Sequence, residues 1–188
     1  FFVLLLSHPS DVRSQPKAIF LLAGQSNMAG RGGVVDNRWD GVVPPECRPD
    51  PRILRLNSAL IWEEAAEPLH RDIDVDRACG IGPGMPFSRS ILGTGGGGGG
   101  LVGLVPCAVG GTNITEWRRG GGLYGRLLSR AQAAVRGGGG AIRGLLWYQG
   151  ESDTESLVDA KQYKGRLEKL FNDFRTDLGS PSLPVIEV

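Results

Sequence analysis

The chain has 188 residues, and its 21 lysines and arginines nearly balance 20 aspartates and glutamates, giving a formal net charge of +1. This balance argues against a polybasic nucleic-acid-binding protein and against an acidic tail. An apolar content of 40% excludes a wholly disordered polypeptide. No apolar run approaches the ~18 residues of a membrane span, so we expect a globular protein of one domain.

The N-terminal segment starts with a short apolar run, FFVLLL over residues 1–6, which polar residues follow. Two interpretations stay open: the remainder of a secretory signal, or an ordinary hydrophobic segment. The localisation, secreted or cytoplasmic, therefore stays open as well. We expect residues 1–16 to be a disordered or signal-derived stub and residues 17–188 to form the domain.

Nearly continuous apolar runs alternate along the chain with segments of helical periodicity. Such runs are typical of strands covered on both faces, as in a parallel sheet, and the amphipathic segments would cover them. The alternation indicates an α/β fold with a doubly wound sheet. The expected strands are residues 17–23, 52–56, 101–109, 141–148 and 183–188, and the expected helices are residues 86–92, 123–135 and 163–178.

Two glycine runs, residues 95–100 and 137–140, each follow an expected helix and precede an expected strand. In doubly wound folds such connections lie away from the ligand crevice, which is at the carboxyl ends of the strands. We expect flexible insertions and no phosphate-binding loop, because no strand leads into either run and no Lys-Ser/Thr follows.

Three internal strands each run into a polar, glycine-containing cluster: GQSNMAG from residue 24, GGTN from residue 110 and QGESD from residue 149. The carboxyl ends of parallel strands share one edge of a sheet, so the clusters should converge on one crevice. A serine on a tight turn exposes its hydroxyl, and Ser26 could donate its own N–H to an oxyanion. A glycine N–H and the Gln149 amide could add further donors. The pattern indicates acyl transfer.

Other interpretations of these residues stay open. Ser26 could cap the next helix, and Gln149 and Glu151 could be ordinary capping residues. Glu151 and Asp153 could form a glycosidase pair, although two residues in one turn are poorly placed to flank a sugar bond.

The alternating aspartates Asp72, Asp74 and Asp76 are spaced like the start of a calcium loop. Neither the glycine nor the final glutamate of such a loop follows, so we expect no metal ion here.

Four segments resemble plant carbohydrate esterases of the sialate O-acetylesterase-like group, within the SGNH/GDSL hydrolase superfamily and related to carbohydrate esterase family 6. The segments are IFLLAGQSNMAGRG, EPLHRDIDVDRACGIGPGMPFSRSIL, VPCAVGGTNITEW and LLWYQGESD. The resemblance implies a flavodoxin-like three-layer α/β/α sandwich with a mostly parallel sheet. It also implies a serine esterase that removes acetyl groups from carbohydrates without a metal or organic cofactor.

The shared motifs imply specific roles for individual residues of this sequence. The resemblance implies Ser26 as the nucleophile, Gly110 or Gly111 and Gln149 in the oxyanion hole, and Glu151 as a possible triad acid. Substrate contacts would come from Gln25, Asn27 and Asn113, and Trp117 would either line the sugar site or pack onto the core.

The family's Asp-x-x-His block, which would supply the catalytic base, does not occur in the sequence, so we expect the last unit of the sandwich to be missing. Serine is a weak nucleophile without a base. His8 lies in the stub, and His70 lies outside the catalytic motifs. We expect an impaired esterase; the alternative is a non-catalytic protein that binds carbohydrate through the same fold. Acetylated carbohydrate or a small ester is the expected partner, no feature favours nucleic acid, and the oligomeric state stays open.

Overall fold

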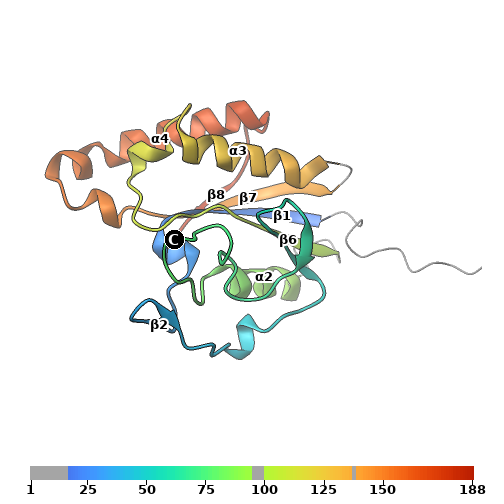
Figure 1. Cartoon of the computed structure of the whole chain (residues 1–188). Helices are drawn as coiled ribbons and strands as arrows, with labels where there is room; N and C mark the ends of the chain where they lie inside the picture. Colours follow the sequence, from blue (N-terminus) through green and yellow to red (C-terminus); the bar gives the residue numbers. More distant parts are fainter. Residues whose placement is uncertain (1–16, 95–99, 137–138) are drawn as a thin grey trace, which may run out of the picture.

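The computed structural model describes residues 17–94, 100–136 and 139–188, and within them a six-stranded sheet forms the centre of the molecule (Figure 1). The strand order is β5-β4-β6-β1-β7-β8, with β4 and β5 antiparallel and all other neighbours parallel. The strands are β1 (Lys17–Gly24), β4 (Ile53–Leu56), β5 (Trp62–Glu64), β6 (Leu101–Pro106), β7 (Gly140–Tyr148) and β8 (Val185–Glu187). A separate small hairpin pairs β2 (Val34–Val35) with β3 (Arg38–Trp39).

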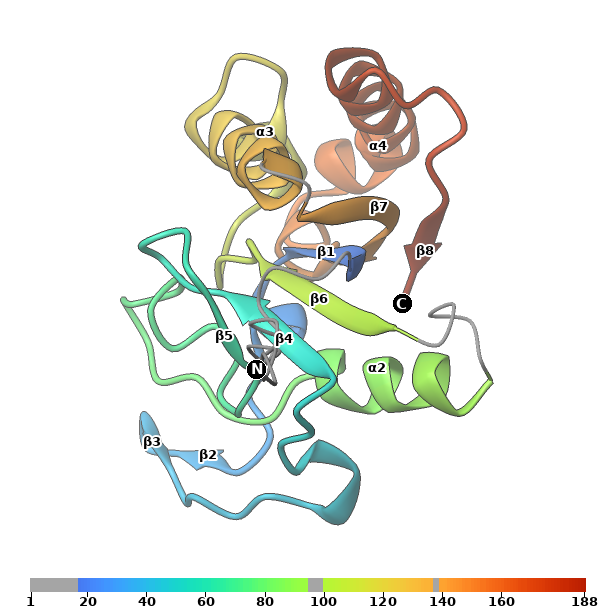
Figure 2. The same ribbon diagram turned by 90° about the vertical axis from the view of Figure 1, so that its right-hand side faces the viewer.

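Helices cover both faces of this sheet, as Figure 2 shows in a view along the strands. Two long helices, α3 (Gly122–Val135) and α4 (Leu157–Leu178), lie on one face. The opposite face carries α2 (Gly84–Gly93) and the single turn α1 (Ser26–Ala29). Short 3-10 turns follow some of the strands: η2 (Pro45–Cys47), η3 (Ile114–Trp117) and η5 (Glu151–Asp153). The three-layer α/β prediction is confirmed.

The two faces of β1 are both buried, because successive side chains of a strand point to opposite sides. Ile19 and Leu21 pack with the apolar side chains of α3 and α4, whereas Phe20 and Leu22 pack with Met85 of α2. Full burial of each such side chain contributes about 1.5–3 kcal/mol. The continuous apolar run in the sequence therefore reflects a central strand.

Some boundaries differ from the sequence-based prediction. The helix expected from residue 163 begins at Leu157, where the Ser156 side chain accepts a hydrogen bond from the Asp159 N–H and caps the first turn. Leu157 and Val158 are exposed, so the first turn lacks the apolar periodicity on which the prediction rested. The short edge strand β5 was not predicted. The stub (1–16), and 95–99 and 137–138 from the glycine runs, lie outside the described residues.

The order of the strands fixes where a ligand crevice can form. From β1 at the centre, the chain builds β6 and β4 on one side and β7 and β8 on the other. Loops that leave the carboxyl ends of β1, β6 and β7 are therefore neighbours, and such a switch point is where open α/β sheets bind ligands. No helix in the described ranges is long and apolar enough to cross a membrane.

Candidate active site

A glycine at the end of β1 allows this strand to approach β7 closely. Gly24 has a φ of +126°, and a Cβ at this position would lie 2.1 Å from the Tyr148 carbonyl oxygen. The next N–H, of Gln25, donates to that same oxygen at 2.9 Å. The chain then turns into α1 at Ser26, which is half-buried. The N-cap of α1 is Gln25, and no side chain caps this helix, so the interpretation of Ser26 as a helix cap is wrong.

The loop after β6 meets this turn at Gly110. A Cβ built on Gly110 would lie 3.6 Å from the Ser26 Cβ, 3.2 Å from Asp74 Oδ2 and 2.5 Å from Arg31 Nη2. A Cβ on Gly111 would meet nothing within 4 Å, and the φ of Gly111 is +76°. Of the two candidate glycines, Gly110 is thus the one packed against Ser26.

Gln149, at the end of β7, joins all three loops. Its buried Nε2 lies 3.1 Å from Gln25 Oε1, 3.0 Å from the Thr112 carbonyl oxygen and 2.7 Å from Asp153 Oδ2. An amide nitrogen carries only two hydrogens. The Gln149 Oε1 is buried without a partner among the described residues. Its nitrogen is therefore already engaged by protein acceptors, and its oxyanion role stays a prediction.

Asp153 and Gln25 complete this network from inside the protein. Asp153 is 2% exposed, and its carboxylate also accepts the backbone N–H of Ile114 at 3.0 Å and 3.2 Å. The burial of Asp153 excludes a glycosidase pair with Glu151, because the second carboxylate would have to reach the sugar. Gln25 is 4% exposed, and its Oε1 also accepts the Ser152 N–H at 3.4 Å. Both side chains therefore hydrogen-bond one loop to another. The substrate contact expected of Gln25 stays a prediction.

On the outer side of these loops, Asn27 and Glu151 are exposed and Asn113 is half-buried. The Asn27 amide donates to the Glu151 carboxylate across the β1 and β7 loops. Asn113 caps η3: its Oδ1 accepts the Thr115 N–H at 3.0 Å, while its own N–H donates to Glu116. Glu151 therefore contacts an amide in this structure, and its role as triad acid stays a prediction.

Trp117 does not line the crevice. It is 0% exposed, its Nε1 donates to the Thr112 hydroxyl at 3.1 Å, and its ring packs edge to face on Trp147. Of the two interpretations of Trp117, packing onto the core is the one that the structure supports.

Of the two histidines in the sequence, His70 is the one that lies within the described residues. It is 1% exposed, and neither ring nitrogen has hydrogen-bond geometry with a described residue. Burial, reinforced by the charges of nearby arginines and opposed by the backbone of Leu22, lowers the pKa of His70 to about 3. A general base works best with a pKa near the working pH, so this ring is poorly suited to activate Ser26.

Arg31 also lies beside Ser26, although motif analysis did not single it out, and it pairs with Asp74, which the sequence analysis considered only for its calcium-like spacing. Their side chains form an ion pair at 2.5 Å directly against Gly110. Asp72 instead pairs with the buried Arg55 at 2.7 Å. Asp72 and Asp74 are thus arginine partners here. Within the described ranges no three histidine, cysteine or acidic side chains are grouped to hold a metal ion.

The three-layer α/β fold and the meeting of the loops after β1, β6 and β7 are features that this chain shares with a family of esterases. The chain belongs to the family described as carbohydrate esterase, sialic acid-specific acetylesterase, whose model matches residues 16–188. A probable carbohydrate esterase of Arabidopsis thaliana is 50% identical over 179 residues, which cover 92% of this chain and 68% of that protein.

Solved structures agree with this family. An X-ray structure of an Arabidopsis thaliana protein has a TM-score of 0.87 at 49% identity, covering 92% of this chain and 74% of its own. NanS has a TM-score of 0.67 at 19% identity, over 92% of this chain and 68% of its own. A carbohydrate acetylesterase of Xanthomonas citri has a TM-score of 0.58 at 16% identity, over 90% of this chain and 41% of its own. The last two likenesses concern the fold alone.

Proposed function

We propose that the crevice between the loops after β1, β6 and β7 binds O-acetylated carbohydrate or a small acetate ester, and that Ser26 is the nucleophile. The observation that carries the proposal is the close approach of Gly110 to Ser26, where a Cβ built on Gly110 would lie 3.6 Å from the Ser26 Cβ. In the described residues, the backbone N–H groups of Ser26 and Gly110 have no hydrogen-bond acceptor. Free N–H groups beside a serine hydroxyl are what an oxyanion hole requires.

In the proposed reaction the Ser26 Oγ attacks the acetyl carbonyl carbon and loses its proton to a base. The bond from the acetyl carbon to the sugar oxygen then breaks, and the sugar leaves as an alcohol that takes up a proton. Water hydrolyses the acetyl-serine to acetate. The Ser26 and Gly110 N–H groups would stabilise the negative oxygen in both steps, where loss of one such donor typically costs about 3–4 kcal/mol.

The proton acceptor limits this chemistry. No hydrogen bond joins the Ser26 hydroxyl to another described residue, and His70 is buried with its pKa lowered to about 3. We therefore propose that this chain hydrolyses esters weakly. The alternative is a protein that binds carbohydrate at the same place without catalysis, and what favours it is that no described residue acts as a base beside Ser26.

Acetate release from an acetylated methyl glycoside, followed by NMR, separates these functions. Slow hydrolysis that added imidazole accelerates, and that Ser26→Ala abolishes with or without imidazole, is expected for an esterase without an efficient base. Binding without any Ser26-dependent release would identify the non-catalytic alternative. Full activity that disappears in a folded His70→Ala variant would contradict our inference that His70 is unsuited to act as the base.

A further inference from the structure

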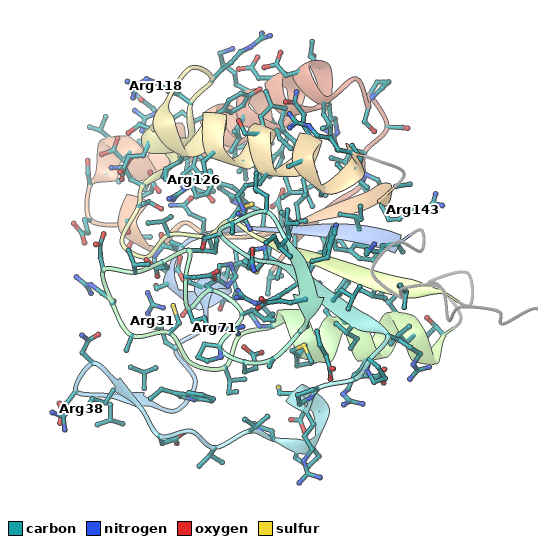
Figure 3. The ribbon with its side chains drawn as sticks, turned by 45° about the vertical axis from the view of Figure 1, so that its right-hand side comes forward. Arg31, Arg38, Arg71, Arg118, Arg126 and Arg143 are labelled. Carbon is teal, nitrogen blue, oxygen red and sulfur yellow. The ribbon has the colours of Figure 1, made fainter. Side chains whose placement is uncertain are left out.

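Arg31 lies on the α2 side of the sheet, at the same end as the proposed nucleophile (Figure 3). One point, where a Cβ of residue 110 would be, is within 2.5 Å of Arg31 Nη2 and 3.6 Å of the Ser26 Cβ. The guanidinium therefore fills space that glycine leaves open. Any ester bound to Ser26 and Gly110 is close to this cation.

The guanidinium is held in place before any ligand arrives. Nη1 donates to the Gly30 carbonyl at 2.9 Å and contacts the Cys79 sulfur at 3.6 Å, and Nη2 donates to Asp74 at 2.5 Å. The Asp74 side chain is 2% exposed, and its backbone N–H donates to the His70 carbonyl at 3.0 Å. A fixed arginine loses little conformational entropy when it binds a ligand.

Two donors of Arg31 remain. A guanidinium has five N–H groups, and the three contacts above use three of them. The Nε–H and the second Nη2–H have no partner among the described residues, and the side chain is 22% exposed. These two N–H groups can reach a ligand while the rest of the guanidinium stays anchored.

The charge balance favours a neutral acceptor. The Asp74 carboxylate already compensates the Arg31 charge, so a second carboxylate would meet little net attraction. Sugar hydroxyl oxygens accept N–H hydrogen bonds without requiring a net charge. Two neighbouring hydroxyls of a pyranose would match two donors on one guanidinium.

Resting on the function proposed above, we infer that Arg31, positioned by Asp74, binds neighbouring hydroxyl groups of the acetylated sugar and so selects a neutral carbohydrate ester. Arg31 would thus act on the sugar side of the ester, whereas Ser26 and Gly110 act on the acetyl side. Simple alkyl acetates would fit the acetyl side alone.

Calorimetric titration of the full chain tests this division. The probes are a mono-O-acetylated methyl xyloside with two free hydroxyls, its uronic acid counterpart, and isopropyl acetate. The main variant is Arg31→Met combined with Asp74→Asn, which avoids leaving a buried carboxylate unpaired. Arg31→Lys keeps the ion pair but removes the Nε–H. Arg118→Met is the matched control, because Arg118 is an exposed arginine on the α3 side (Figure 3).

We expect the double variant to bind the xyloside roughly ten- to a hundredfold more weakly and Arg31→Lys several-fold more weakly. Binding of isopropyl acetate by these variants, and binding of the xyloside by the Arg118→Met variant, should change by less than about twofold. Either folded Arg31 variant binding the xyloside like the unmodified chain would overturn the inference. So would an Arg31-dependent preference for the uronic acid. An unmodified chain that binds none of the three esters would refute the proposed function itself.

Discussion

Replacing Gly110 by alanine adds one methyl group at the contact between the proposed nucleophile and the Arg31–Asp74 ion pair. The new Cβ would lie 2.5 Å from Arg31 Nη2, where ordinary contact begins at 3.4 Å. The guanidinium must therefore withdraw by about an ångström, which loosens its ion pair with Asp74. Overpacking of this kind typically costs about 1–3 kcal/mol.

Two other glycines supply matched controls. Gly125 lies inside helix α3 with nothing within 4 Å of its added Cβ, so alanine there should stabilise the protein by up to about 1 kcal/mol. Gly111 is equally open, but its φ of +76° makes alanine cost about 1–2 kcal/mol through backbone strain alone.

Urea unfolding and xyloside titration together distinguish the three variants. Gly110→Ala should lose both stability and ligand affinity, Gly111→Ala should lose only stability, and Gly125→Ala should lose neither. A Gly110→Ala variant that matches Gly125→Ala in both assays would refute the reasoning that Gly110 is the glycine of the site.

Two further predictions concern buried acids. Asp153→Ala leaves the buried Ile114 N–H without its acceptor and removes one of the three acceptors of the Gln149 amide, so urea unfolding should show a loss of about 1–3 kcal/mol, against almost none for the exposed Glu155→Ala. Burial raises the pKa of Glu67 from 4.5 to about 7, so the unfolded chain ionises first as the pH rises. The free energy of unfolding should therefore fall between about pH 4.5 and pH 7, by up to about 3 kcal/mol relative to Glu67→Gln; a pH-independent difference between the two proteins would contradict this.

Much of the fold was predictable, because the central strands are buried on both faces and leave continuous apolar runs in the sequence. The same logic placed three polar clusters at one edge of the sheet, where Gln25, Thr112 and Gln149 do meet. What sequence patterns did not reveal is how side chains pair across loops. Arg31 and Asp74 are 43 positions apart, and only the strand order and the turn after His70 bring them together.

The predicted start of helix α4 and the missed edge strand were wrong for a different reason. The first turn of α4 is set by the Ser156 cap and not by burial, so apolar periodicity could not detect it. Likewise, the interior position of Trp117 depends on Thr112 and Trp147, which lie beside it only once the sheet has formed.

The shared amide of Gln149 has an energetic consequence. The two amide protons of Gln149 serve three acceptors. A stronger hydrogen bond to one loop therefore weakens the hydrogen bonds to the other two. Substitutions at Gln25 and Asp153 should consequently be non-additive, since each one frees a Gln149 amide proton that the remaining acceptors can take. The ends of β1, β6 and β7 are thus coupled through Gln149, so that a substitution at one strand end changes the hydrogen bonds at the other two.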